Sequence, residues 1–155
     1  MPTSHLRDDR FARAFTEIIT PFTPDGRSID LDRLDAQIAR QAEGGITGRV
    51  VAGTTGERTT LEEVEYRTLV RHWVEVGKMH DLVVVAGTGS SSTAHAVRLQ
   101  RIALDLGADA GLSASPSENQ PTQDGLYAHF ATIAESVELP IMLELNQERA
   151  GQDLH

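Results

Sequence analysis

The chain has 155 residues, of which 23 are acidic and 14 basic, so its formal net charge is −9. A length near the commonest single-domain size predicts one domain with one moderate core. The acidic balance, without a Lys/Arg cluster or an interleaved aromatic stripe, argues against nucleic acid as a partner. Because the chain has no cysteine, disulfides and thiolate metal sites are excluded.

No apolar stretch approaches the roughly 20 residues of a membrane span. Residues 1–13 are polar and lack the apolar core of a signal peptide. We therefore expect no membrane contact and a cytoplasmic protein, with residues 1–13 as a polar arm and residues 14–155 as the folded domain. Arginine accounts for 13 of the basic residues, so Lys78 is the only lysine and any lysine chemistry in this chain must use it.

Apolar runs and turn signals alternate from the start of the domain. The run from Ala14 to Phe22 favours a strand that ends near Thr20. Asp30 can cap a helix that ends at the glycine pair 44–45, and GRVVAG (48–53) reads as a buried strand. Thr60, followed by two acids, predicts a hydroxyl cap at the start of a second helix. Its expected apolar stripe is Leu61, Val64, Leu69, Trp73 and Val76.

The same cycle continues to the end of the chain. Strands are predicted at 82–87, 108–114 and 139–145, and helices at about 93–106 and around 126–137. Five strands alternating with four helices, at a period of roughly 30 residues, predict a parallel α/β architecture of βα units. The pattern leaves two options open: a doubly wound open sheet or part of a (β/α)8 barrel.

Both options place functional loops at the carboxyl ends of the strands, where GTTGE (53–57), GTGSSS (87–92), SPSEN (115–119) and LNQERAG (145–151) fall. Two glycines around paired threonines can present N–H groups and hydroxyls to a small anion. Taken alone, GTTGE is better interpreted as a plain strand-to-helix turn. The segment 87–92 lacks the lysine of a P-loop, so a tight turn is the better interpretation there too.

Seven motifs occur in a familiar order: TPF (20–22), GTTGE, AGTGSSST (86–93), P-x-x-N (116–119), PTQDGLYAHF (121–130), LPIML (139–143) and R-x-G-x-D-L (149–154). With them the chain resembles the dihydrodipicolinate synthase/N-acetylneuraminate lyase family of pyruvate-dependent aldolases, from about Phe15 to Leu154. Members are (β/α)8 TIM barrels of nearly twice this length. The resemblance therefore implies a partial barrel with strands one to five and helices one to four.

In this family a lysine on the sixth strand forms a Schiff base with pyruvate, paired threonines bind the pyruvate carboxylate and two tyrosines relay protons. Carried over by motif, Thr54 and Thr55 are expected to bind a pyruvate-like carboxylate. Arg149 matches the arginine that meets the second substrate. Glu118 and Glu144 stand at the two tyrosine positions. No cofactor and no metal are implied.

The sixth strand and its lysine have no counterpart in these 155 residues. Lys78 is predicted at the end of the second helix, on the rim opposite the binding loops, and cannot replace that lysine. Glu17 falls where the family has a small residue lining the pyruvate pocket. With Glu118 and Glu144 it could form a repurposed acid/base or hard-cation site. Loss of selection for pyruvate is favoured instead, because no histidine or aspartate completes a metal shell.

A half-barrel would expose apolar edges on strands one and five, which predicts homo-oligomers or association with homologous chains. Three functions stay open. The first is a truncated family member, inactive alone, whose ancestral reaction condenses pyruvate with an aldehyde or cleaves the product. The second is half of a split aldolase completed by a partner chain. The third is a non-catalytic protein that binds full-length homologues.

Overall fold

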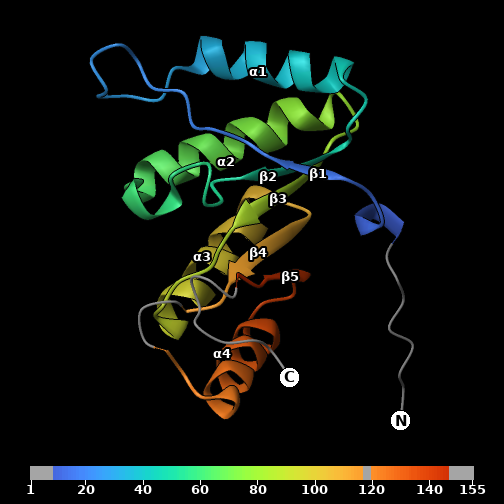
Figure 1. Cartoon of the computed structure of the whole chain (residues 1–155). Helices are drawn as coiled ribbons and strands as arrows, with labels where there is room; N and C mark the ends of the chain where they lie inside the picture. Colours follow the sequence, from blue (N-terminus) through green and yellow to red (C-terminus); the bar gives the residue numbers. More distant parts are fainter. Residues whose placement is uncertain (1–8, 117–119, 147–155) are drawn as a thin grey trace.

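Five parallel strands and four helices alternate along the chain in the computed structural model, which describes residues 9–116 and 120–146 (Figure 1). The strands are β1 (Phe15–Glu17), β2 (Gly48–Val51), β3 (Val83–Gly87), β4 (Ala110–Ala114) and β5 (Ile141–Glu144). The helices are α1 (Leu31–Glu43), α2 (Glu63–Lys78), α3 (Thr93–Leu106) and α4 (Gln123–Ser136), with short 3-10 helices η1 (Asp9–Phe11) and η2 (Arg58–Thr60). The sheet order is β1-β2-β3-β4-β5, so each strand pairs with its neighbours in sequence.

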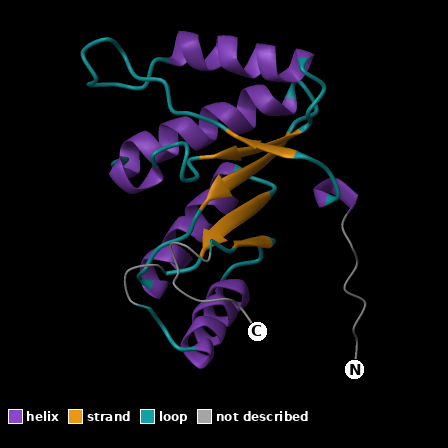
Figure 2. Cartoon of the chain, in the orientation of Figure 1, coloured by secondary structure: helices purple, strands orange, loops and turns teal. Residues whose placement is uncertain are grey.

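The sheet separates two apolar layers. Helices α1 to α4 surround its outer side (Figure 2), where Trp73, Leu34 and Val84 belong to the largest buried cluster. The inner side carries a smaller cluster made of Val50, Val83, Val85 and Ala110, against which Phe11 and Phe15 pack. The four α-helices lie on one face only, which is the layering of a barrel and not of a doubly wound sheet. The expected partial barrel, with five strands and four helices, is confirmed.

The predicted start of the second helix is wrong. Thr60 lies in η2 and its hydroxyl donates to the Glu57 carbonyl at 2.8 Å. Helix α2 begins at Glu63, and its cap is formed by Glu62 and Glu65, whose carboxylate accepts from the Glu62 N–H at 2.8 Å. A capping box built from two glutamates satisfies the same N–H groups that a threonine would.

The predicted stripe of α2 is wrong at Val64, which is 76% exposed. The buried positions of this helix are Tyr66, Leu69, Val70, Trp73, Val74 and Gly77. They recur every three or four residues, whereas Val64 lies two residues before Tyr66 and therefore on the opposite face of the helix.

Strand β1 ends three residues before the predicted end at Thr20. The Thr20 side chain is 5% exposed and donates to the Gly56 carbonyl at 2.7 Å. This segment therefore leaves the sheet to support the loop after β2, which places GTTGE next to the end of β1.

Among residues 9–116 and 120–146, both outer strands of the sheet have one unpaired edge, because β1 pairs with β2 only and β5 with β4 only. Beside β5 lies an apolar groove of about 510 Å³ that includes Tyr127, Phe130, Ile141 and Leu143. Tyr127 and Leu143 are 77% and 47% exposed. Within the part of the chain that the structure describes, no other element covers this groove.

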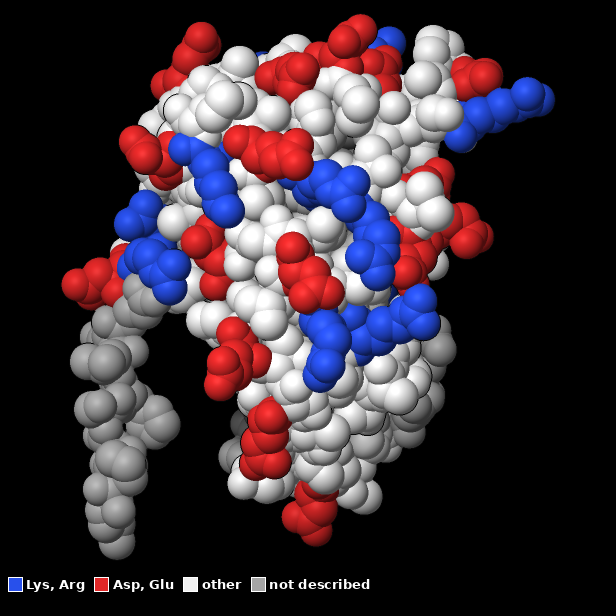
Figure 3. All heavy atoms as spheres, turned by 180° about the vertical axis from the view of Figure 1, so that it is seen from behind, with Lys and Arg blue, Asp and Glu red and all other residues white. Residues whose placement is uncertain are grey.

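Charged side chains of both signs are interspersed on the face seen in Figure 3. In the described ranges, no helix has both the length and the apolar character needed to cross a membrane.

Candidate functional site

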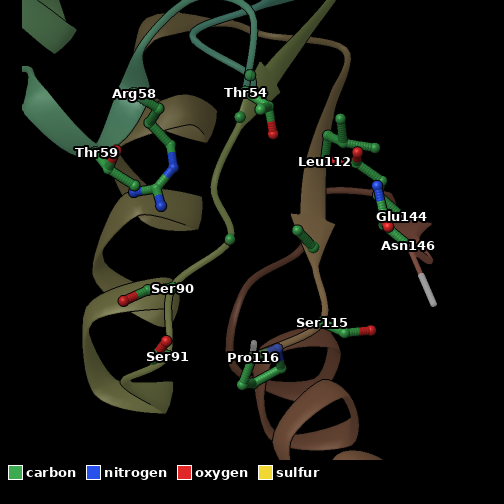
Figure 4. Close-up of a pocket in the computed structure, with 14 residues that line it drawn as sticks. Thr54, Arg58, Thr59, Ser90, Ser91, Leu112, Ser115, Pro116, Glu144 and Asn146 are labelled. Carbon is green, nitrogen blue, oxygen red and sulfur yellow. The ribbon is translucent and has the colours of Figure 1, made fainter. Parts of the chain in front are cut away.

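A pocket of about 350 Å³ opens at the carboxyl ends of β2 to β5. Thr54 and Arg58 line it from the loop after β2, and Ser90 and Ser91 from the loop after β3 (Figure 4). Ser115, Pro116, Glu144 and Asn146 complete the opposite wall. Parallel strands end at one rim of the sheet, so the four loops that the sequence separates by about 30 residues meet here.

The loop after β2 has a backbone shape held by its own contacts. Ala52 and Glu57 adopt left-handed conformations, with φ of 53° and 57°. The Glu57 N–H donates to the Thr54 carbonyl at 3.1 Å and the Arg58 N–H to the Gly53 carbonyl at 3.3 Å. With the buried bond from Thr20 to Gly56, these contacts leave the N–H groups of residues 54 and 55 pointing out of the loop.

Those N–H groups bind the carboxylate of Glu17. Thr54 N donates to Glu17 Oε1 at 2.9 Å, and Thr55 N donates to Oε2 at 3.3 Å. The Thr55 hydroxyl donates to Oε2 as well. Both carboxylate oxygens are therefore held by one loop, with hydrogen bonds strengthened by the charge. The loop after β2 is a carboxylate cradle, defined here by Thr54, Thr55 and Gly53.

Gly53 makes this approach possible. A Cβ atom at position 53 would overlap Glu17 Oε1. Glu17 is the last residue of β1 and lies on the same face of the strand as Phe15, which packs in the inner cluster. Its side chain consequently rises from the inside of the half-barrel to the rim.

Arg58 gives the pocket a cation, and the sequence analysis missed it. The side chain is half-buried and extends toward the pocket in Figure 4. Desolvation lowers the pKa of Arg58, partly opposed by the nearby Tyr66. Burial in turn raises the pKa of Tyr66, whose hydroxyl is buried without a hydrogen-bond partner among the described residues. The sequence feature that could have identified Arg58 is its position directly after GTTGE.

The loop after β3, which the sequence predicted as a tight turn, forms part of the pocket wall. A Cβ at Gly87 would overlap the Ala52 carbonyl, and one at Gly89 would lie 2.6 Å from Ala114 N. Both glycines allow neighbouring loops to touch. Ser92 then caps α3, accepting from His95 N at 3.4 Å. Ser90 and Ser91 were not predicted as pocket residues, because the segment 87–92 was interpreted as a turn that binds nothing.

Of the remaining predicted site residues, the structure describes Glu144 but not Glu118 or Arg149. Glu144 lies on the pocket wall opposite Thr54, on the same face of β5 as Met142 of the inner cluster. Glu118 and Arg149 fall outside the described residues. Among the residues that are described, no group of three or more His, Asp or Glu side chains could hold a metal ion. Lys78 ends α2, next to the amino end of β3 and thus on the rim opposite the pocket.

Residues 10–155 match the dihydrodipicolinate synthetase family. The chain is 41% identical over 150 residues to the 4-hydroxy-tetrahydrodipicolinate synthase of Acetivibrio thermocellus, a match that covers 96% of this chain and 50% of that enzyme. The chain thus spans about half the length of the curated relatives it matches.

Solved structures give the same result. The dihydrodipicolinate synthase of Acinetobacter baumannii complexed with pyruvate superposes with a TM-score of 0.87 at 39% identity, over 92% of this chain and 48% of that one. The prophage protein YagE of E. coli K12, also in complex with pyruvate, has a TM-score of 0.83 at 27% identity, over 90% of this chain and 46% of its own.

Proposed function

The chain belongs to the dihydrodipicolinate synthetase family, and on that premise we propose that it forms the carboxylate-binding half of a Schiff-base aldolase or lyase. The reaction would condense pyruvate with an aldehyde or cleave the product. In this proposal Thr54 and Thr55 bind the pyruvate carboxylate and Arg149 meets the second substrate. The chain alone would be inactive.

One observation carries the proposal: a loop at the mouth of a pocket holds a carboxylate with two N–H groups and a hydroxyl. The donors differ from those of a phosphate loop, because no lysine accompanies them. Two relatives with the same fold contain pyruvate, whose carboxylate has the same donor requirement. Arg58 adds a positive charge to the pocket, which favours an anion there.

The amine nucleophile must come from outside the residues that line this pocket. A Schiff base needs a primary amine next to the bound keto acid. Lys78 is the only lysine and lies on the other rim. We infer that the rest of the barrel supplies the amine, whether on the same polypeptide or on another. The unpaired edge of β5 and the groove beside it are the surfaces that such a segment would cover.

Borohydride trapping tests this proposal. The chain would be co-expressed with the C-terminal half of the Acetivibrio thermocellus enzyme, incubated with pyruvate and borohydride, and examined by intact-mass spectrometry and gel filtration. We expect a one-to-one complex, with a pyruvate adduct only on the added half and only when this chain is present. Lys78→Arg is the matched control and should leave the adduct unchanged.

Two results would contradict the proposal. An adduct on the isolated chain that Lys78→Arg abolishes would place the amine on the wrong rim. Failure of the two halves to form a complex would show that the open edge does not accept the missing strands.

A second candidate is a non-catalytic protein that associates with full-length homologues, and the exposed Tyr127 and Leu143 beside β5 favour it. Its distinguishing result is a complex with an intact homologue, isolated by affinity capture of this chain, in which the homologue keeps its own pyruvate adduct and this chain gains none.

A further inference from the structure

The carboxylate cradle is already filled by the chain itself. Glu17 lies 37 positions before Thr54 and 38 before Thr55, so the contact is neither a helix cap nor a local turn. Its two oxygens use the N–H groups of both residues and the Thr55 hydroxyl. A free carboxylate could make no further bond to these three donors.

The cradle does not depend on Glu17 for its shape. The loop is closed by bonds among residues 53 to 58 and by the buried Thr20 hydroxyl on the Gly56 carbonyl. A Cβ at Gly56 would lie 3.0 Å from both Ala52 and the Ile18 carbonyl, so the loop also packs directly on its neighbours. Removing the Glu17 side chain therefore leaves the donors in place and without their acceptor.

The Glu17 carboxylate has an advantage over a free carboxylate that competes for the cradle. A group tethered to its binding site has an effective concentration of about millimolar or more. The Glu17 side chain is nevertheless exposed, so a small carboxylate in solution can reach the same donors.

We propose that Glu17 is an intramolecular ligand of the carboxylate cradle, which keeps small α-keto monocarboxylates out until its side chain is displaced. The proposal rests on the proposed function for the identity of the competing ligand. The internal contact itself needs only the geometry of Glu17, Thr54 and Thr55. In this chain the cradle is thus a closed site, and Glu17→Ala converts it into an open one.

The test is a titration of the full ¹⁵N-labelled chain with sodium pyruvate, at ionic strength held constant with sodium chloride. The Thr54 and Thr55 amide signals of the unmodified chain are compared with those of Glu17→Ala and the near-isosteric Glu17→Gln. Glu144→Ala is the matched control, since it removes one charge from the other wall of the same pocket. Glu17→Ala combined with Thr55→Val removes the ligand and part of the cradle together.

We expect pyruvate to bind Glu17→Ala with a Kd about tenfold lower than that of the unmodified chain, because the tethered competitor is gone. Glu17→Gln should show a smaller gain, Glu144→Ala should stay within about twofold, and the double variant should lose the gain. Without pyruvate, the Thr54 and Thr55 amide signals should move upfield in Glu17→Ala, as expected when N–H groups lose a charged acceptor.

Equal pyruvate affinity in the unmodified chain and Glu17→Ala would overturn the proposal, as would unchanged Thr54 and Thr55 signals in the absence of pyruvate. Absence of binding in both Glu17→Ala and Glu17→Gln would overturn it too. These outcomes are separate from those of the proposed function, which is decided by complex formation and by the position of the adduct. If Glu17→Ala bound pyruvate more tightly but the two halves formed no complex, the inference about Glu17 would hold while the proposed function would fail.

Discussion

Single buried polar groups link the sheet to helix α3. The Thr88 hydroxyl donates to Gln100 Oε1 at 2.8 Å, and Gln100 Nε2 donates to the Leu139 carbonyl at 3.1 Å. Both side chains are inaccessible to solvent, so the pair links the end of β3, helix α3 and the approach to β5 through satisfied polar groups.

His129 has a hydrogen-bond partner for only one of its two ring nitrogens among the described residues. Its Nδ1 lies 2.8 Å from the Thr93 hydroxyl, while its Nε2 is buried without a partner among the described residues.

His129 should make stability depend on pH. Burial lowers its pKa, so the unfolded chain binds a proton more readily than the folded one. The free energy of unfolding should therefore fall as pH drops below the unfolded pKa of about 6.5, by at most about 1.4 kcal/mol per pH unit from this group. Urea unfolding of the chain and of His129→Gln between pH 7.5 and 5.5 measures the difference, which the variant should lack.

The exposed His80→Gln is the control and should keep the pH dependence of the unmodified chain. If His129→Gln retained the full dependence, the buried ring would not be its source.

At the scale of elements, the site depends on how closely β2 and β3 and their loops approach. Gly87 ends β3, and a Cβ there would overlap the backbone carbonyl of Ala52, which itself has a left-handed φ of 53°. The contact lies directly before Gly53, the first residue of the cradle. The position of the carboxylate donors is consequently coupled to the absence of a side chain on the neighbouring strand.

Gly87→Ala should destabilise the chain by at least about 2 kcal/mol, because backbone atoms must move to admit the methyl group. It should also shift the amide signals of Thr54 and Thr55. Urea unfolding and an amide spectrum measure both effects. Gly125→Ala is the control: its Cβ would meet Pro121 and Thr122 at an ordinary contact distance of 3.4 Å, and alanine is the better helix former by up to about 1 kcal/mol. If Gly87→Ala lowered the free energy of unfolding by less than about 1 kcal/mol, the loop after β2 would be able to move away from the added methyl group at little cost.

For the whole molecule, the open side of the sheet matters most. The inner cluster of Val50, Val83, Val85 and Ala110 is small, and no described residues pair with the outer edges of β1 and β5. Unpaired strand edges invite pairing with another chain. The groove beside β5 adds exposed apolar surface at one of these edges, while a net charge of −9 opposes self-association.

We expect the isolated chain to self-associate through this edge, more strongly at higher salt because its charge is screened. Leu143→Lys places a cation in the groove and should reduce association by about tenfold, as charged residues on edge strands do. Sedimentation equilibrium at two salt concentrations measures this. Glu75→Gln, which makes the same charge change on the exposed part of α2, should not weaken association. Equal weakening by both variants would show that the effect is not specific to the groove.

Local patterns in the sequence were sufficient to predict most elements. The third helix occupies 93–106 as predicted, and Asp30 caps α1 by accepting from Arg33 N at 3.0 Å. These predictions succeeded because apolar spacing, glycine and capping side chains act within a few residues. The errors at Thr60 and Val64 have one cause. Thr60 and Glu62 are both possible caps for the second helix, and the choice between them decides where the helix begins and which of its residues face the core.

The sequence by itself determined the order of strands and helices, the loops at the carboxyl rim and the resemblance to the family. Only the tertiary structure decided that Glu17 reaches Thr54 and Thr55, that Arg58 enters the pocket and that Glu144 faces them. The reason is separation along the chain. A contact between residues 17 and 55 depends on the strand register and on the curl of the sheet, which no local pattern encodes.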